Sequence, residues 1–291
     1  MYKIGLSTCG KPLTAELFKA YRAAGIEVAE ISVAREEYPT LDFEAVAQYA
    51  KEGGVELWSF HLPFAGYTNI ASPDEEVRQE AVRILSDYIR KAASIGIKIY
   101  VIHPSVGANP DEERALRIAC AKKSLAELAE VAAECGGELA VEDLPRTCLG
   151  RCSYELLELI SGDDRLRVCF DTNHLLMEDP AEFVRKVGKK IVTIHVSDFD
   201  YLNERHWLPG EGDLQWDKIL AALQEVGYQG PWLYEINFAA PRSMQRERDL
   251  TCEDFARNAQ EIFEGKELTV LPAVRPKMYH WTRVRPTEPK R

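Results

Sequence analysis

The sequence lacks the features that mark disulfide-rich, membrane-spanning and nucleic-acid-binding proteins. Its seven cysteines are odd in number and no two have the CxxC spacing, which indicates reduced thiols in a cytoplasmic protein. No apolar run approaches the roughly 18 residues that a membrane span needs, so no membrane partner is expected. The net charge is −11 and the pI about 5.2, which disfavours a nucleic-acid partner because phosphates bind to basic surfaces.

A glycine-rich phosphate-binding turn is also missing from the start of the chain. Residues 2–7 have the character of a first strand rather than of a signal peptide, and no glycine-rich turn follows them. This absence disfavours an open doubly wound sheet, which is the structural alternative to a barrel. The length of 291 residues suits one large α/β barrel or two smaller domains.

Short apolar runs alternate with amphipathic helical segments along most of the chain. The clearest helical segment has Pro73 and the acidic residues 74–76 in its first turn, and its apolar residues recur at spacings of three and four up to Gly96. Eight such strand-and-helix units of about 30 residues predict a single-domain α/β fold, the (β/α)₈ TIM barrel. The expected strands are residues 2–7, 26–33, 55–60, 97–102, 138–141, 166–170, 191–196 and 231–236.

Two segments fall outside this repeat. The connection 197–213 is too long for a simple loop and is expected to be functional. We expect the barrel to occupy residues 1–265 and a basic, proline-containing C-terminal tail to occupy residues 266–291. The tail is interpreted as an arm or disordered end that packs on the barrel or on a second subunit of a homodimer or homotetramer.

Carboxylates and histidines stand at the ends of six of the expected strands. In a TIM barrel the C-terminal ends of all strands face one mouth, so these side chains are expected to converge. Taken singly, each of these residues is explained equally well by packing or by hydrogen bonding to a loop. Their joint pattern favours a metal site. Three carboxylates and one imidazole suit Mn²⁺, Co²⁺ or Mg²⁺, and Zn²⁺ is an alternative. The four candidate ligands, from strands five to eight, are Glu142, Asp171, His195 and Glu235.

These motifs together resemble the xylose isomerase-like TIM barrels, a superfamily of sugar isomerases and epimerases that also contains the endonuclease IV-like AP endonucleases. The resemblance extends to about residue 265, and the order and spacing of the motifs make it fairly specific. The motifs are His61-Leu-Pro-Phe, Ile-His103-Pro, Val-Glu142, Phe-Asp171-Thr-Asn-His174, Ile-His195-Val-Ser-Asp198, Arg205-His206-Trp-Leu-Pro-Gly-Glu-Gly and Tyr-Glu235.

The resemblance to ketose epimerases implies a metal-dependent sugar or sugar phosphate isomerase/epimerase. Its single divalent metal would be held by the four candidate ligands, and Glu142 and Glu235 would also transfer protons through a metal-stabilised enediolate. The position of His174 would contact the sugar or polyol substrate. The chain departs from these epimerases after Glu142, where it reads Asp-Leu-Pro-Arg-Thr-Cys in place of a further acid, so the identity of the sugar stays open. Asp198 is expected either to orient His195 or to cap the following loop.

The same motifs match the AP endonucleases, which bind three zinc ions through nine ligands. The nine matching positions are His61, His103, Glu142, Asp171, His174, His195, Glu204, His206 and Glu235. Glu204 stands where that family has aspartate. A metal-dependent polyol dehydratase of the inosose dehydratase kind is a third hypothesis. Outside the main ligand set, we therefore expect substrate binding or additional metal binding by His61, His103, His174, Glu204, Arg205 and His206.

Overall fold

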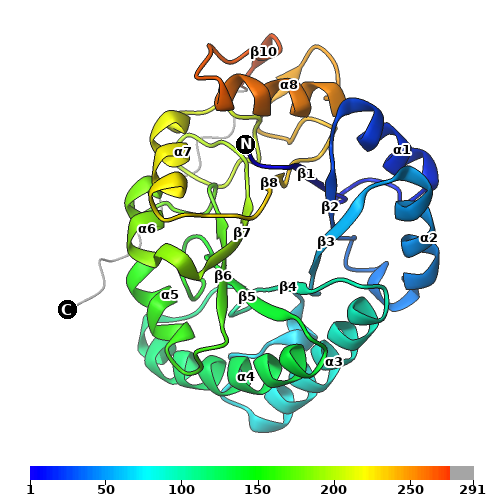
Figure 1. Ribbon diagram of the computed structural model, residues 1–291. Coiled ribbons are helices and arrows are strands. Elements are labelled where there is room, and N and C mark those ends of the chain that lie inside the picture. The colour runs from blue at the N-terminus through cyan, green and yellow to red at the C-terminus, as the bar shows by residue number, and fades with distance from the viewer. Residues whose placement is uncertain (276–291) are drawn as a thin grey trace.

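The computed structural model describes residues 1–275 as a barrel of eight parallel strands surrounded by helices (Figure 1). Neighbouring strands are hydrogen-bonded in chain order from β1 to β7, and β8 pairs with β1. Between β7 and β8 the amide of Val196 donates to the carbonyl of Leu233 at 2.8 Å, which closes the ring. The predicted (β/α)₈ barrel is confirmed. The strands are β1 (Ile4–Ser7), β2 (Val28–Ile31), β3 (Glu56–His61), β4 (Ile99–Ile102), β5 (Glu138–Glu142), β6 (Arg167–Asp171), β7 (Ile191–His195) and β8 (Trp232–Tyr234).

The α-helices form the outer layer of the barrel (Figure 1). Their apolar faces and the outward faces of the strands make one continuous core. No helix in the described part of the chain combines the length and the hydropathy that a membrane span requires. The helices are α1 (Ala15–Ala24), α2 (Phe43–Gly53), α3 (Glu75–Ser94), α4 (Arg114–Glu134), α5 (Ser153–Ile160), α6 (Pro180–Val187), α7 (Trp216–Glu225) and α8 (Cys252–Phe263), with 3₁₀ turns at Tyr38–Thr40, Gly66–Thr68, Asp111–Glu113 and Gly188–Lys190.

Side-chain caps set the ends of the helices. The hydroxyl of Thr14 accepts a hydrogen bond from a first-turn amide of α1, and Gly25 ends this helix in the left-handed conformation. In α3 the carboxylate of Asp74 accepts from two first-turn amides. The helix therefore begins at Glu75, and Pro73 precedes the cap instead of lying inside the first turn as the sequence suggested.

The barrel interior changes character along its axis. Because side chains alternate between the two faces of a strand, Ala140 and Glu142 of β5 point to the same side, as do Cys169 and Asp171 of β6. The earlier residue of each pair, Ala140 or Cys169, joins a separate apolar cluster, and the later residue, Glu142 or Asp171, is a carboxylate. Apolar side chains therefore fill the part of the barrel toward the N-terminal ends of the strands, and carboxylates stand at the C-terminal ends. The apolar cluster consists of Ile99, Val101, Ala140 and Cys169, packed against Trp58 and Val192.

A short two-stranded antiparallel sheet holds the last described residues against the barrel. β9 (Gln245–Arg246) pairs antiparallel with β10 (Ala273–Val274). Arg246 donates two hydrogen bonds of 2.7 Å to Glu211, which belongs to the long connection after β7. The guanidinium of Arg275 lies 4.3 Å from the ring centroid of Trp207 in the same connection. The remainder of the predicted tail, residues 276–291, lies outside the described residues.

Candidate metal centre

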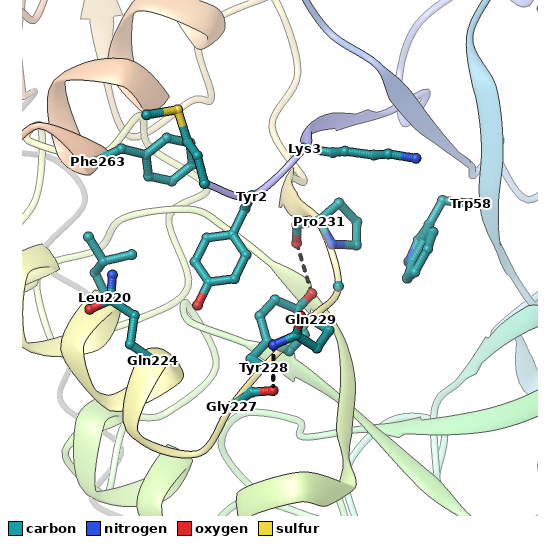
Figure 2. Close-up of a pocket in the computed structure, with 12 residues that line it drawn as sticks. Tyr2, Lys3, Trp58, Leu220, Gln224, Gly227, Tyr228, Gln229, Pro231 and Phe263 are labelled. Atoms are coloured by element: carbon teal, nitrogen blue, oxygen red, sulfur yellow. Dashed lines mark hydrogen bonds between the residues drawn. The ribbon is translucent and has the colours of Figure 1, made fainter.

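Two cavities lie at the two ends of the barrel, a lower one at the N-terminal ends of the strands and an upper one at their C-terminal ends. The lower one, of about 630 Å³, is lined by the aromatic rings drawn in Figure 2, including Tyr2, Trp58 and Phe263. Its polar groups are largely paired: the hydroxyl of Tyr228 donates to the carbonyl of Pro231 at 2.8 Å, as Figure 2 shows. None of the four clusters of metal-binding side chains found in residues 1–275 lies there. The chemistry is therefore expected at the other end.

The upper cavity lies at the C-terminal ends of the strands and has a volume of about 460 Å³. Each ionisable side chain in its wall comes from a strand end or from the connection after a strand, the region where a TIM barrel carries its active site. Seven of the predicted site residues line it: His61, His103, Glu142, His174, Glu204, His206 and Glu235.

A four-residue cluster forms the floor of this cavity. Glu142, Asp171 and His195 are the last residues of β5, β6 and β7, and Glu235 directly follows β8. One ligand atom from each of the four lies within 4.8 Å of the others. The Nδ1 atom of His195 is 3.4 Å from Glu142 Oε1 and 3.3 Å from Glu235 Oε2.

The converging atoms have no hydrogen-bond partners among the described residues. Glu142 Oε1, Asp171 Oδ2 and His195 Nδ1 are all buried without one. Buried carboxylate oxygens facing an imidazole nitrogen are costly unless a cation joins them. Three carboxylates and one nitrogen, aimed at one point and lacking a proton donor, fit a divalent cation. We call Glu142, Asp171, His195 and Glu235 the central cluster.

Two histidines flank the central cluster on the side of β3 and β4. The Nε2 atoms of His61 and His103 both lie 3.2 Å from Glu142 Oε2. The opposite nitrogen of His61 donates to the carbonyl of Leu62 at 2.9 Å, which turns Nε2 toward the carboxylate. Phe64 stacks on His103 with ring centroids 4.3 Å apart and is half-exposed in the cavity wall.

A second flanking group lies on the side of β6 and β7. His174 donates from Nδ1 to the carbonyl of Asp143 at 2.8 Å, and His206 from Nδ1 to the carbonyl of Glu235 at 3.2 Å. Both Nε2 atoms therefore face Glu204, each 3.5 Å from its Oε1 atom. These three side chains could also hold a metal.

Arg205, which was a predicted site residue, and Arg146, which follows β5, both lie outside the cavity lining. Arg205 is buried and donates two hydrogen bonds to Asp200, at 3.0 and 2.8 Å. Arg146 contacts the outer oxygen of Glu204 and donates to Asn203 at 2.5 Å. Of the ten predicted site residues, nine are thus gathered around the upper cavity, and Arg205 instead braces the connection after β7.

The pKa values of the two glutamates of the central cluster are shifted in opposite directions. Burial raises the pKa of Glu235 to about 7; His195 opposes this shift, and the nearby carboxylates Glu142 and Asp171 add to it. Burial also favours the neutral form of Glu142, but His103 and His195 hold its pKa well below the usual value. Two carboxyl groups with pKa values pushed apart can serve as an acid and a base at the same pH.

Asp198 was expected either to orient His195 or to cap the loop after β7, and its contacts show the cap. Asp198 accepts hydrogen bonds from the amides of Phe199, Gly210 and Leu214, and so caps the loop. The partner of His195 is instead Glu30 on β2, a residue that the sequence reasoning missed. Its signal is a carboxylate inside an otherwise apolar strand.

The sequence of this chain is similar to those of several known proteins. An uncharacterized protein of Methanocaldococcus jannaschii is 31% identical over 179 residues, covering 58% of this chain and 61% of that protein. D-psicose 3-epimerase of Enterocloster bolteae is 29% identical and aligns with 73% of each chain. A probable endonuclease 4 of Acholeplasma laidlawii is 26% identical over 67% of this chain and 72% of its own length.

Solved structures agree with this relationship. A D-tagatose 3-epimerase-like protein superposes with a TM-score of 0.72 at 25% identity and covers 90% of this chain and 96% of its own. The family described as "Xylose isomerase-like TIM barrel" matches residues 18–253, which include the central cluster and both flanking groups. The chain therefore belongs to the xylose isomerase-like TIM barrel family, as its motifs suggested.

Proposed function

We propose that the chain is a divalent-metal-dependent sugar isomerase or epimerase in which Glu142 and Glu235 transfer protons. The observation that carries this proposal is the meeting of both glutamates with Asp171 and His195 in one cluster, in which Glu142, Asp171 and His195 each bury a ligand atom that has no hydrogen-bond partner. The relatedness to D-psicose 3-epimerase and to a D-tagatose 3-epimerase-like protein supports the same class of reaction.

The two glutamates suit opposite halves of a proton transfer. A divalent cation held by the central cluster would polarise a sugar carbonyl and stabilise the negative charge that develops when the adjacent carbon loses its proton. In the metal-free protein, His103 and His195 hold the pKa of Glu142 well below its usual value, and burial raises the pKa of Glu235 to about 7. We therefore assign proton acceptance to Glu142 and proton donation to Glu235. Donation to the opposite face of the same carbon gives an epimer, and donation to the neighbouring carbon gives an aldose–ketose isomer. The reverse reaction exchanges the two roles.

The cavity wall favours an uncharged sugar over a sugar phosphate. No lysine or arginine is among the described residues that line the cavity. Arg146 is paired with Glu204, and Arg205 with Asp200, so neither is free to bind a phosphate. Six uncharged side chains make the outer wall instead: Val33, Ala34, Phe64, Ala239, Ala240 and Pro241.

Metal analysis and a substrate panel test this proposal. Protein purified without chelator is expected to carry about one Mn, Co or Mg ion per chain. In deuterated water it should interconvert a free ketose with uptake of deuterium at the exchanging carbon, while ketose phosphates and cyclic polyols are poorer substrates.

Glutamine substitutions test the two roles directly. Glu142→Gln and Glu235→Gln should each lower kcat by about 10²–10⁴-fold, the usual contribution of an acid–base group. Glu247→Gln is the matched control, since Glu247 is exposed and lies outside the cavity lining. Near-normal turnover in both cluster variants would overturn the assignment.

An AP endonuclease is a second candidate function, and one observation favours it. The nine positions that match its zinc ligands all lie in the central cluster or the two flanking groups. A content near three zinc ions per chain, with cleavage of abasic-site DNA, would establish this alternative. The absence of lysine and arginine from the described cavity lining argues against it, because phosphodiester backbones are bound through such side chains.

A further inference from the structure

Glu30 is a buried carboxylate that the proposed proton transfers do not use. It lies on β2 with no exposed surface, inside the barrel rather than in the cavity lining. The register between β2 and β3 shifts between Ala29 and Glu30, and this irregularity places Glu30 opposite Ser59. The hydroxyl of Ser59 donates to Glu30 Oε2 at 2.9 Å.

The same oxygen of Glu30 receives a second hydrogen bond from a member of the central cluster. His195 donates from Nε2 to Glu30 Oε2 at 3.0 Å. The other ring nitrogen of His195, Nδ1, faces Glu142 and Glu235. The imidazole therefore lies between a fixed acceptor on one side and the central cluster on the other.

This arrangement determines which nitrogen of His195 is available. A neutral imidazole carries one N–H group and one lone pair, and a carboxylate can only accept. Glu30 therefore retains the proton on Nε2 and leaves the lone pair on Nδ1, pointing into the central cluster. Carboxylates that hold ligand histidines in this way typically change metal affinity by about 10- to 100-fold when they are removed.

We propose that Glu30 is a positioning residue that fixes the ring orientation and the tautomer of His195 for metal binding. This inference rests on the proposed metal-dependent function and extends it to a strand that contributes no ligand. Burial of a carboxylate without a lysine or arginine partner among the described residues is costly for folding, so its hydrogen bond to His195 accounts for its presence better than packing does.

Titration of the metal-free full-length protein with Co²⁺ tests the inference in the absence of any sugar. Calorimetry gives the affinity, and the visible absorption of bound Co²⁺ reports on its ligand set. Glu30→Ala removes the acceptor, Glu30→Gln keeps an acceptor oxygen without the charge, and Ser59→Ala removes the other partner of Glu30 while leaving the bond to His195. Thermal melts verify that each variant is folded.

We expect Co²⁺ to bind about 10- to 100-fold more weakly to Glu30→Ala with an altered spectrum, and about 3- to 10-fold more weakly to Glu30→Gln. Ser59→Ala should stay within about twofold of the unmodified chain. Should Glu30→Ala fail to fold, Glu30→Gln decides the matter. A folded Glu30 variant with unchanged affinity and spectrum overturns the inference, as does an unmodified chain that binds no metal. A chain whose Co²⁺ affinity depends on Glu30 as expected but that converts no ketose overturns only the proposed sugar chemistry.

Discussion

At the scale of single residues, the burial of Glu235 makes the stability of the fold depend on pH. Its side chain is mostly buried, and its pKa of about 7 lies above the ordinary value of 4.5. A raised pKa means that the folded, metal-free protein binds this proton more tightly than the unfolded chain does. The corresponding contribution to stability is complete below about pH 4.5 and is lost as the pH rises through about 7.

Replacement of Glu235 by glutamine should therefore stabilise the metal-free protein at alkaline pH. We expect Glu235→Gln to raise the free energy of unfolding by about 1–3 kcal/mol at pH 8, and by much less at pH 5. Urea unfolding in the presence of a chelator, at both pH values, measures the difference. Glu247→Gln, at an exposed position, should show no such pH dependence. An equal effect of Glu235→Gln at pH 5 and pH 8 would contradict the prediction.

The residues of the site differ in how far the sequence could predict them. The convergence of Glu142, Asp171 and His195 could be predicted because each ends an apolar strand, and strand ends of a barrel share one mouth. The role of Glu30 could not, because a carboxylate within a strand gives no sign of its partner on another strand. The pairing of Arg205 with Asp200 was missed for a related reason, because the sequence does not show whether a loop arginine binds substrate or pairs with a nearby carboxylate.

At the scale of elements, the connection 197–213 owes its shape to Asp198. This fully buried carboxylate accepts from the amides of Phe199 and Leu214 through one oxygen, and from the amide of Gly210 and the indole of Trp216 through the other. The chain between these anchors contains Glu204 and His206. One carboxylate therefore joins the start of the connection to the start of α7 and holds a flanking group of the site in place.

Asp198→Asn should destabilise the fold and weaken the site together. The NH₂ group of asparagine donates but cannot accept hydrogen bonds, so the two donors that face it lose their acceptor, at a cost of about 2–4 kcal/mol in unfolding free energy. Denaturant unfolding measures that loss, and turnover by the folded variant should fall with it because Glu204 and His206 are no longer held in place. Asp213→Asn, in the same connection but exposed, is the control. Full stability of Asp198→Asn would show that water or rearranged backbone replaces these bonds.

At the scale of the whole molecule, the barrel could be predicted because its pattern repeats eight times. An error of one or two residues at a strand end, as at β2 (Val28–Ile31) against the expected 26–33, does not change the count or the order of the units. The two-stranded sheet of β9 and β10 was not foreseen, because two-residue strands carry no periodicity. The role expected for the tail at a subunit interface stays a prediction.

The charge of the whole molecule leads to a last prediction about its partners. The chain has a net charge of −11, and no lysine or arginine is among the described residues that line the cavity through which DNA would have to reach a bound metal. Without phosphate contacts there are few counterions to release, so association with duplex DNA should be weak and should show little dependence on salt. We expect no binding of abasic-site DNA at physiological ionic strength in a fluorescence anisotropy titration. Tight binding at low salt that weakens steeply, with a slope equivalent to several phosphate contacts, would favour the nuclease over the sugar enzyme. That result would imply that a basic surface outside the cavity guides DNA to the three groups of ligands.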